Sequence, residues 1–269
     1  MKLNLNFNRK PKALHDDSEQ TMQRILNKDS DFTVVEKYKA MRTNIMFSMT
    51  KKDHGRAIVV TSSTPGEGKT TTTINLAITF AQTGARVMLI DCDLRKSRIH
   101  RYLGLEKKDG VSNVLCGFLT LDQAIKKNVR DNLDCLTAGE IPPNPAELLE
   151  SEEFGKMIDE LKQRYDYIFV DTPPVTVVTD AAVAMKSCSG AIVVVRKDVT
   201  TFDLLDETME ILMNTGKKII GVAMLGTEDA KKGYGYYKKG GKYGYKYGYK
   251  YGYKYDYRYE YKYRDEDEE

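Results

Sequence analysis

A glycine-bearing loop lies between an apolar stretch and a stretch typical of a helix, and this arrangement constrains the fold more than any other feature. The loop reads Ser-Thr-Pro-Gly-Glu-Gly-Lys-Thr over residues 63–70. Apolar, mostly β-branched residues precede it at 57–60, and a Thr-, Ala- and Leu-rich segment follows it to residue 82. A strand, a glycine loop and a helix in this order are the setting of a phosphate-binding loop. The alternative is a glycine-rich turn that only caps a helix, and the flanking strand and helix argue against it.

Each residue type in the loop has a physical use. Gly66 and Gly68 let the backbone approach an anion, and the amides at the helix start point toward phosphate oxygens. Lys69 places a cation against the β- and γ-phosphates, and the Thr70 hydroxyl is suited to bind Mg²⁺. Ser63 is a departure, because the general pattern has glycine at this position. The residues expected to contact a nucleotide are Thr64, Pro65, Gly66, Glu67, Gly68, Lys69, Thr70 and Thr71.

Strands and helices alternate from residue 57 to residue 225. We expect strands at 57–62, 86–91, 133–137, 166–171, 189–195 and 218–225, and helices near 69–82, 112–118, 145–163, 178–186 and 201–215. Nearly continuous apolar strands such as 192–195 indicate a parallel sheet covered on both faces. The sequence therefore predicts an α/β fold of the P-loop NTPase type, with a mostly parallel sheet between two layers of helices.

Acidic residues follow two of these strands directly. Asp91 and Asp93 end one apolar strand, and Asp171 ends another. Ligands of parallel sheets bind at the carboxyl ends of the strands. Mg²⁺ takes oxygen ligands and usually keeps several waters, so we expect Asp93 and Asp171 to hold the ion with Thr70, partly through water. The alternative for each carboxylate is a helix N-cap or a turn residue.

Length and composition limit the number of domains, the localisation and the state of the cysteines. At 269 residues the chain has room for one α/β domain. No run of eighteen apolar residues and no apolar signal core are present, so we expect a cytoplasmic protein. The four cysteines lack metal-like spacing and are expected to be reduced thiols: Cys92, Cys116, Cys135 and Cys188. We divide the chain into a flexible N-terminal arm at 1–32, a domain at 33–227 and a tail at 228–269.

The domain is expected to begin with an amphipathic helix over residues 33–49. Its apolar face is formed by Val34, Tyr38, Met41, Ile45 and Met49. Glu36 and Lys39 project away from this face, and Arg42 lies at its flank. The simplest interpretation of these three residues is a solvated charged surface.

The tail is the most unusual segment. Between residues 234 and 263 tyrosine recurs almost every second residue, with Gly, Lys, Arg, Asp or Glu between. Aliphatic residues are absent, so the tail cannot bury a core and is expected to be disordered. Taken alone it is a sticky low-complexity tail, a single-strand nucleic-acid binder or an arm for an acidic surface. A phosphate loop on the same chain favours another use, as a tract of phosphorylatable hydroxyls.

Together these features resemble the bacterial protein-tyrosine kinases of capsule and exopolysaccharide synthesis. The resemblance rests on the loop at 63–70, the acidic stretches at 89–95 and 168–174, the Pro-Pro-Asn-Pro-Ala-Glu-Leu-Leu stretch at 142–149, and the C-terminal tyrosine cluster. The family's oligomerisation motif, Glu-x-x-Arg-x-x-Arg, is matched by Glu36, Lys39 and Arg42. Lysine in place of the first arginine keeps the charge but loses the bidentate fork.

The resemblance implies a kinase that uses ATP and Mg²⁺ to phosphorylate its own C-terminal tyrosines in trans within a ring, expected to be an octamer. It further implies a membrane-spanning activator with a polysaccharide chain-length domain, which recruits the cytoplasmic kinase to the plasma membrane. A cognate tyrosine phosphatase completes the cycle that regulates polysaccharide polymerisation or export, and no nucleic-acid partner is expected. The implied acceptors are Tyr243, Tyr245, Tyr247, Tyr249, Tyr251, Tyr253, Tyr255, Tyr257, Tyr259, Tyr261 and Tyr263.

For catalysis we expect Lys69, Asp91, Asp93 and Asp171 to act together. Asp91 is the expected acceptor of the tyrosine proton, because a free phenol has a pKa of about 10 and arrives protonated. The alternative function is a partition or division-site ATPase switch with a sticky or nucleic-acid-binding tail. The many tyrosines argue against it, as does the lack of a second lysine early in the loop.

Overall fold

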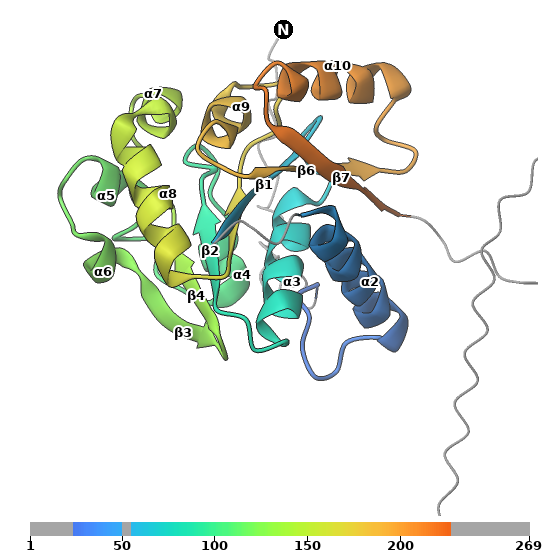
Figure 1. Cartoon of the computed structure of the whole chain (residues 1–269), viewed down its shortest axis with the longest axis horizontal. Helices are drawn as coiled ribbons and strands as arrows, with labels where there is room; N and C mark the ends of the chain where they lie inside the picture. The colour runs from blue at the N-terminus through green and yellow to red at the C-terminus, as the bar shows by residue number, and fades with distance from the viewer. Residues whose placement is uncertain (1–23, 50–54, 227–269) are drawn as a thin grey trace, which may run out of the picture. The chain divides into compact units, whose positions relative to one another are not determined.

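The computed structural model describes residues 24–49 and 55–226, which contain one sheet of seven strands. The strand order is β3-β4-β2-β5-β1-β6-β7 (Figure 1). The strands are β1 (Arg56–Ser62), β2 (Val87–Asp91), β3 (Lys126–Arg130), β4 (Leu133–Leu136), β5 (Tyr167–Asp171), β6 (Gly190–Arg196) and β7 (Lys218–Leu225). All neighbours pair in parallel except β3 and β4, which are antiparallel. The predicted α/β fold with a mostly parallel sheet is confirmed.

Helices cover both faces of this sheet. They are α2 (Phe32–Ser48), α3 (Lys69–Ala81), α4 (Ile99–Leu103), α5 (Val111–Leu115), α6 (Leu121–Ala124), α7 (Pro145–Glu150), α8 (Glu152–Arg164), α9 (Asp180–Met185) and α10 (Phe202–Met213). Helices α2 and α3 lie on one face, and α7, α8 and α9 lie on the other (Figure 1). Within these residues, no helix is both long and apolar enough to cross a membrane.

The period-2 geometry of the central strands divides the interior into two cores. In β1, Ala57 and Val59 pack toward α8 and α9, whereas Ile58 and Val60 pack toward α2 and α3, and all four side chains are buried. Successive side chains of a strand point to opposite faces, so a continuous apolar run fills both cores. This placement makes β1 a rigid support for the loop that follows it.

Several predicted elements differ in their bounds. The helix predicted over 145–163 is two helices, because Ser151 has an extended backbone with ψ 157°. The Ser151 hydroxyl accepts a hydrogen bond from the Phe154 amide at 3.3 Å and so begins α8. The helix predicted over 112–118 ends at Leu115. The short helices α4 and α6 and the polar edge strand β3 were not predicted.

Helix α2 packs against α3 with a face slightly different from the predicted one. Tyr38 and Ile45 are buried, but Val34 is 43% exposed and Val35 packs in its place. The reason is local: the Asp31 carboxylate accepts from the Thr33 and Val34 amides, so Val34 belongs to the capped first turn.

The described part of the predicted N-terminal arm packs against the domain. Ile25 and Leu26 are buried, and the Asn75 side chain of α3 holds the backbone on both sides of Ile25. Its Oδ1 accepts from the Leu26 amide at 2.8 Å, and its Nδ2 donates to the Arg24 carbonyl at 3.0 Å. Residues 1–23 lie outside the described residues. So do residues 228–269, with the predicted disorder of the tail and all the predicted acceptor tyrosines.

Candidate functional site

The carboxyl ends of three neighbouring strands meet at a hollow of about 470 Å³. The loop after β1, the segment after β2 and the segment after β5 all line it. Strand β5 pairs with both β1 and β2, and the register places Asp91 opposite Asp171. Of the residues predicted to contact a nucleotide, this lining includes Pro65, Gly66, Gly68, Lys69, Thr70 and Thr71. Thr64 and Glu67 are outside it.

The two glycines of the loop adopt backbone conformations that other residues rarely reach. Gly66 has φ 86° and Gly68 has φ 96°. A Cβ atom at Gly68 would lie 2.6 Å from Leu225 Cδ1 at the end of β7. Glycine at this position therefore allows both the positive φ and a close approach of β7 to the loop.

Lys69, the first residue of α3, points to the segment after β2. Its Nζ lies 3.0 Å from Asp93 Oδ2, and both side chains are nearly buried. Burial alone would lower the pKa of Lys69, but Asp171 and Asp93 outweigh it, and the pKa is raised overall. The lysine is therefore a charged group whose partner in the structure is a carboxylate.

Asp171 is bound by two hydroxyls of α3. Its Oδ2 accepts from Thr70 Oγ1 at 2.7 Å, and its Oδ1 accepts from Thr73 Oγ1 at 3.2 Å. Burial raises the pKa of Asp171, while Lys69 and the Thr70 hydroxyl oppose that rise. Thr73 was not among the predicted site residues, although its spacing of three from Thr70 places both on one helix face.

Asp91 is fully buried and does not line the hollow. Its Oδ1 accepts from the Asp93 amide at 3.2 Å, and its Oδ2 accepts from the amides of Arg98 and Ile99 at 3.2 and 3.1 Å. Burial, with Asp171 nearby, raises its pKa to about 8. These hydrogen bonds hold residues 93–99 against the end of β2.

Two polar contacts join the loop to the β6–α10 side of the domain. The buried Glu67 carboxylate accepts from the Thr64 amide at 3.0 Å and from the Thr200 hydroxyl. Ser63 Oγ accepts from Thr208 Oγ1 of α10 at 2.8 Å. Glycine has no hydroxyl for this second contact, which gives serine a structural use at the departure from the general pattern.

The residues around Lys69 form an oxygen-rich set of the kind that Mg²⁺ prefers. The Thr70 hydroxyl donates to Asp171, and Asp93 accepts from Lys69. No group of three or more His, Cys, Asp or Glu residues forms a metal cage within residues 24–49 and 55–226. Mg²⁺ is commonly bound through one or two carboxylates, waters and substrate phosphates, so this donor set fits it.

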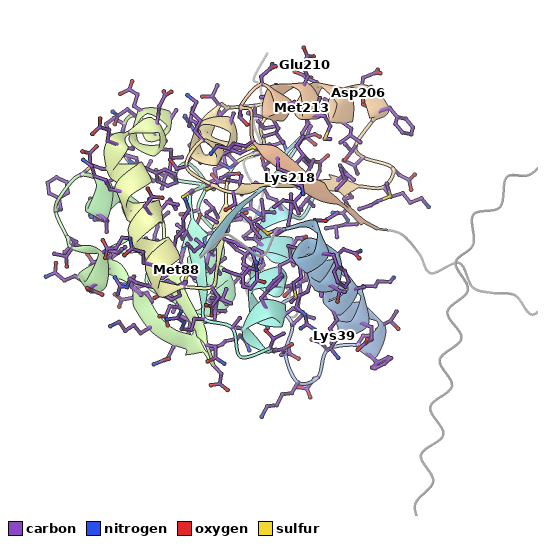
Figure 2. All side chains as sticks on the ribbon, in the orientation of Figure 1. Lys39, Met88, Asp206, Glu210, Met213 and Lys218 are labelled. Carbon is purple, nitrogen blue, oxygen red and sulfur yellow. The ribbon has the colours of Figure 1, made fainter. Side chains whose placement is uncertain are left out.

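The predicted oligomerisation residues lie on α2, away from this hollow. Lys39 Nζ lies 2.7 Å from Glu36 Oε1, and the Lys39 side chain is 44% exposed at the surface of the helix (Figure 2). Arg42 NH1 donates to the Thr79 carbonyl at 2.7 Å and so joins α2 to α3 within the chain.

The glycine loop, its lysine and the facing carboxylates define a P-loop protein, and residues 55–224 match the family described as AAA domain. This fold implies nucleotide binding, usually with Mg²⁺. The chain is 38% identical over 203 residues to tyrosine-protein kinase YwqD of Bacillus subtilis (strain 168), covering 75% of this chain and 85% of the relative. The chain belongs to the family of bacterial tyrosine-protein kinases.

Two solved structures agree with this assignment. The chimerical protein CapA2B2 is 34% identical with a TM-score of 0.70, over 76% of this chain and 89% of that chain. The kinase domain of Escherichia coli tyrosine kinase ETK is 30% identical with a TM-score of 0.68, over 80% of each chain. The family, the fold and the enzyme class predicted from the sequence are confirmed, and the protein is a protein-tyrosine kinase.

Proposed function

We propose that this kinase uses Mg·ATP to phosphorylate tyrosines 243–263 of its own tail. The observation that carries the proposal is the contact between Leu225 and the phosphate loop at Gly68. Strand β7, whose sequence continues toward the tract, thus ends at the loop that we propose binds phosphate. About 36 residues separate β7 from Tyr263, and a flexible chain of that length spans roughly 30–36 Å. That reach supports transfer to a neighbouring subunit.

The chain's own residues position the reaction. Lys69 exchanges its Asp93 partner for oxygens of the β- and γ-phosphates, while the loop amides bind the same phosphates. Thr70, Asp171 and Asp93 hold Mg²⁺, partly through water. When bound, the ion neutralises charge on the phosphate oxygens. The bond from the γ-phosphorus to the β–γ bridging oxygen breaks, a bond to the tyrosine oxygen forms, and ADP leaves.

The phenol proton needs an acceptor, and we assign it to Asp91. Burial and the neighbouring Asp171 raise its pKa above the usual range, which makes the ionised carboxylate a stronger base toward a phenol. Because both Asp91 oxygens accept backbone hydrogen bonds, at least one of these bonds must be exchanged before the carboxylate meets the acceptor hydroxyl.

Transfer in trans requires an assembly, and we propose a ring, an octamer, formed through α2. Glu36, Lys39 and Arg42 stand at the positions of the family's oligomerisation motif. The helix also presents apolar side chains to solvent, since Phe32 and Phe47 are 76% and 85% exposed. Arg42 contacts α3 of its own chain, so we expect it to stabilise the helix face rather than to cross the interface alone.

The regulatory partners follow from the family. A membrane-spanning activator with a polysaccharide chain-length domain recruits the kinase to the inner face of the plasma membrane, and a tyrosine phosphatase reverses the modification. The solved CapA2B2 protein is a chimera, which supports a second polypeptide as partner. The cycle regulates polymerisation or export of a capsular or extracellular polysaccharide.

The proposal is tested by incubating the full chain with Mg²⁺ and γ-labelled ATP, with and without an activator fragment, and mapping phosphotyrosine by mass spectrometry. Label on residues 243–263, abolished in Lys69→Met, is the expected result. Nucleotide hydrolysis without tyrosine label, even with the fragment present, would leave an ATPase switch. Binding of single-stranded nucleic acid is measured in parallel, and tight binding would support a nucleic-acid tail instead.

A further inference from the structure

Cations surround the mouth of the phosphate hollow. Besides Lys69, its lining contains Arg95 and four more exposed basic residues, which we call the cationic rim: Arg24, Lys96, Arg98 and Arg196. They come from the segment before α2, from the segment after β2 and from the end of β6. Chain segments far apart in the sequence thus bring the same charge to one opening.

The two remaining cations differ from the rim because each has a carboxylate partner. Lys69 pairs with Asp93 at 3.0 Å. Arg95 forms two hydrogen bonds with the fully buried Asp180, at 3.0 and 3.1 Å. Among the described residues that line the hollow, Asp93 is the one carboxylate. Within the described residues no ion pair involves a rim cation, although Arg196 donates to the Gly66 carbonyl at 3.3 Å.

A bound nucleotide does not neutralise all the positive charge of the cations that line the hollow. Mg·ATP carries a net charge of about −2, and Lys69 with the loop amides already addresses its phosphates. The same lining also has an apolar wall, formed by Pro173, Pro174, Val177 and Val178. An apolar wall suits an aromatic ring, and a cationic edge suits carboxylates on either side of that ring.

We propose that the cationic rim selects acceptor tyrosines that have acidic neighbours. This inference rests on the proposed function and names its substrate class, an acidic tyrosine peptide. The chain's own tail offers both kinds of acceptor. Residues 241–254 place only Gly and Lys between tyrosines, whereas Asp256, Glu260 and the acidic run 265–269 flank the tyrosines from 255 onward. Tyr261 and Tyr263 are therefore the preferred first acceptors.

Binding tests the site without needing turnover. A labelled peptide of residues 255–269 is compared with the same peptide in which every Asp and Glu is Asn or Gln, by fluorescence anisotropy on the full chain with Mg·ADP. We expect the acidic peptide to bind about tenfold more tightly, because several exposed ion pairs contribute roughly 0.2–1 kcal/mol each. The preference should shrink as salt rises. Equal affinity of the two peptides would overturn the proposal.

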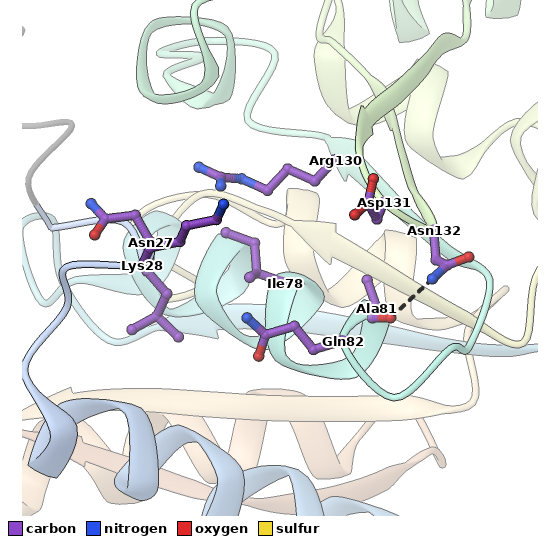
Figure 3. A pocket seen from close by; sticks show the side chains of 9 residues that line it. Asn27, Lys28, Ile78, Ala81, Gln82, Arg130, Asp131 and Asn132 are labelled. Carbon is purple, nitrogen blue, oxygen red and sulfur yellow. Dashed lines mark hydrogen bonds between the residues drawn. The ribbon is translucent and has the colours of Figure 1, made fainter.

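Matched charge reversals assign the effect to the rim. Lys96→Glu with Arg98→Glu should abolish the preference, and Lys96→Gln with Arg98→Gln should reduce it. The control pair reverses two exposed cations at a second hollow at the other end of α3, with Lys28→Glu and Arg130→Glu (Figure 3). The control should keep the preference. An equal loss in both pairs would show a general charge effect and overturn the assignment.

Turnover then separates the inference from the function on which it rests. With γ-labelled ATP the wild-type chain should phosphorylate the acidic peptide with a kcat/KM about tenfold higher, and rim variants should change KM for the peptide more than KM for ATP. Label on both peptides at equal kcat/KM would end the selectivity proposal and keep the kinase. Selective binding with no phosphotyrosine on any peptide or tail would instead contradict the proposed autophosphorylation.

Discussion

The two ends of helix α3 both border a hollow, but they are built differently. At its first turn, Lys69 and Thr70 face buried carboxylates through hydrogen bonds of 3.0 and 2.7 Å. At its last turn, a hollow of about 580 Å³ is lined by exposed Lys28, Arg130 and Asp131 (Figure 3). The charged residues of the larger hollow are all exposed, whereas the smaller hollow has buried, hydrogen-bonded charges in addition to the exposed cationic rim.

This difference shows what marks a functional site in such a fold. Burying charged groups is costly unless each has a partner, so a protein retains them where they have a use. Exposed charges carry little cost, so exposure alone does not mark a site. Matched substitutions at the two ends of α3 therefore separate the chemistry of the site from the general properties of the helix.

The largest contrast is expected between Lys69→Met and Lys28→Met. Removing the Lys69 charge deprives the transferring phosphate of its nearest cation, and transfer of label from γ-marked ATP to tyrosine should fall about 100- to 1000-fold. Lys28→Met should leave the rate unchanged, because this side chain lies at the other end of α3. Full activity of Lys69→Met would remove the lysine from the mechanism.

A second contrast compares Asp171→Asn with Asp131→Asn. Asp171 is proposed to hold Mg²⁺ and accepts hydrogen bonds from the hydroxyls of Thr70 and Thr73. Its loss should therefore raise the Mg²⁺ concentration needed for half-maximal transfer by about 10- to 100-fold. The measurement is a Mg²⁺ titration of the initial rate, and EDTA should stop the wild-type reaction. Identical titrations for Asp171→Asn and the wild type would contradict the assignment.

A third contrast concerns stability. Asn75→Ala removes the partner of the Leu26 amide and of the Arg24 carbonyl, and leaving buried polar groups unsatisfied costs about 1–3 kcal/mol. Urea unfolding should show that loss. Gln82→Ala, at the exposed end of the same helix, should stay within about 0.5 kcal/mol of the wild type. Similar values for the two variants would show that Asn75 does not anchor the N-terminal segment.

The smallest effect is expected at Ser63. Ser63→Ala loses its contact with Thr208, which keeps its bond to the Leu204 carbonyl, so unfolding should become about 0.5–1.5 kcal/mol easier. Ser97→Ala is the matched control, because the buried Ser97 hydroxyl has no partner among the described residues. Should both variants unfold alike, the serine at position 63 would have no stabilising role.

Local patterns predicted which side chains come together at the candidate site. An apolar strand followed at once by an acid or by a glycine loop is visible in sequence, and a parallel sheet brings such strand ends to one edge. Asp93, Asp171 and Lys69 accordingly meet. Helix α3 and the central strands were also predicted within a residue or two, because their apolar runs are long.

Contacts between polar residues that are far apart in the sequence cannot be recognised from a local sequence pattern. Arg95 and Asp180 are 85 residues apart, and Glu67 and Thr200 are 133 apart. Strand β3 is a polar edge strand with no apolar alternation, and its sequence, Lys-Lys-Asn-Val-Arg, resembles a loop. Arg24 reaches the hollow because Asn75 holds its backbone, which only the folded structure reveals.

Strand β7 ends beside Gly68 of the loop, and the tyrosine tract follows later in the same chain. The proposed acceptor hydroxyls are therefore carried by the enzyme itself, and within one subunit or one assembly their effective concentration does not fall when the protein is diluted. A rate per molecule that stays constant on dilution would mean that each tail is phosphorylated by its own subunit or within a ring that does not dissociate. A rate that falls with dilution would mean that subunits must first meet.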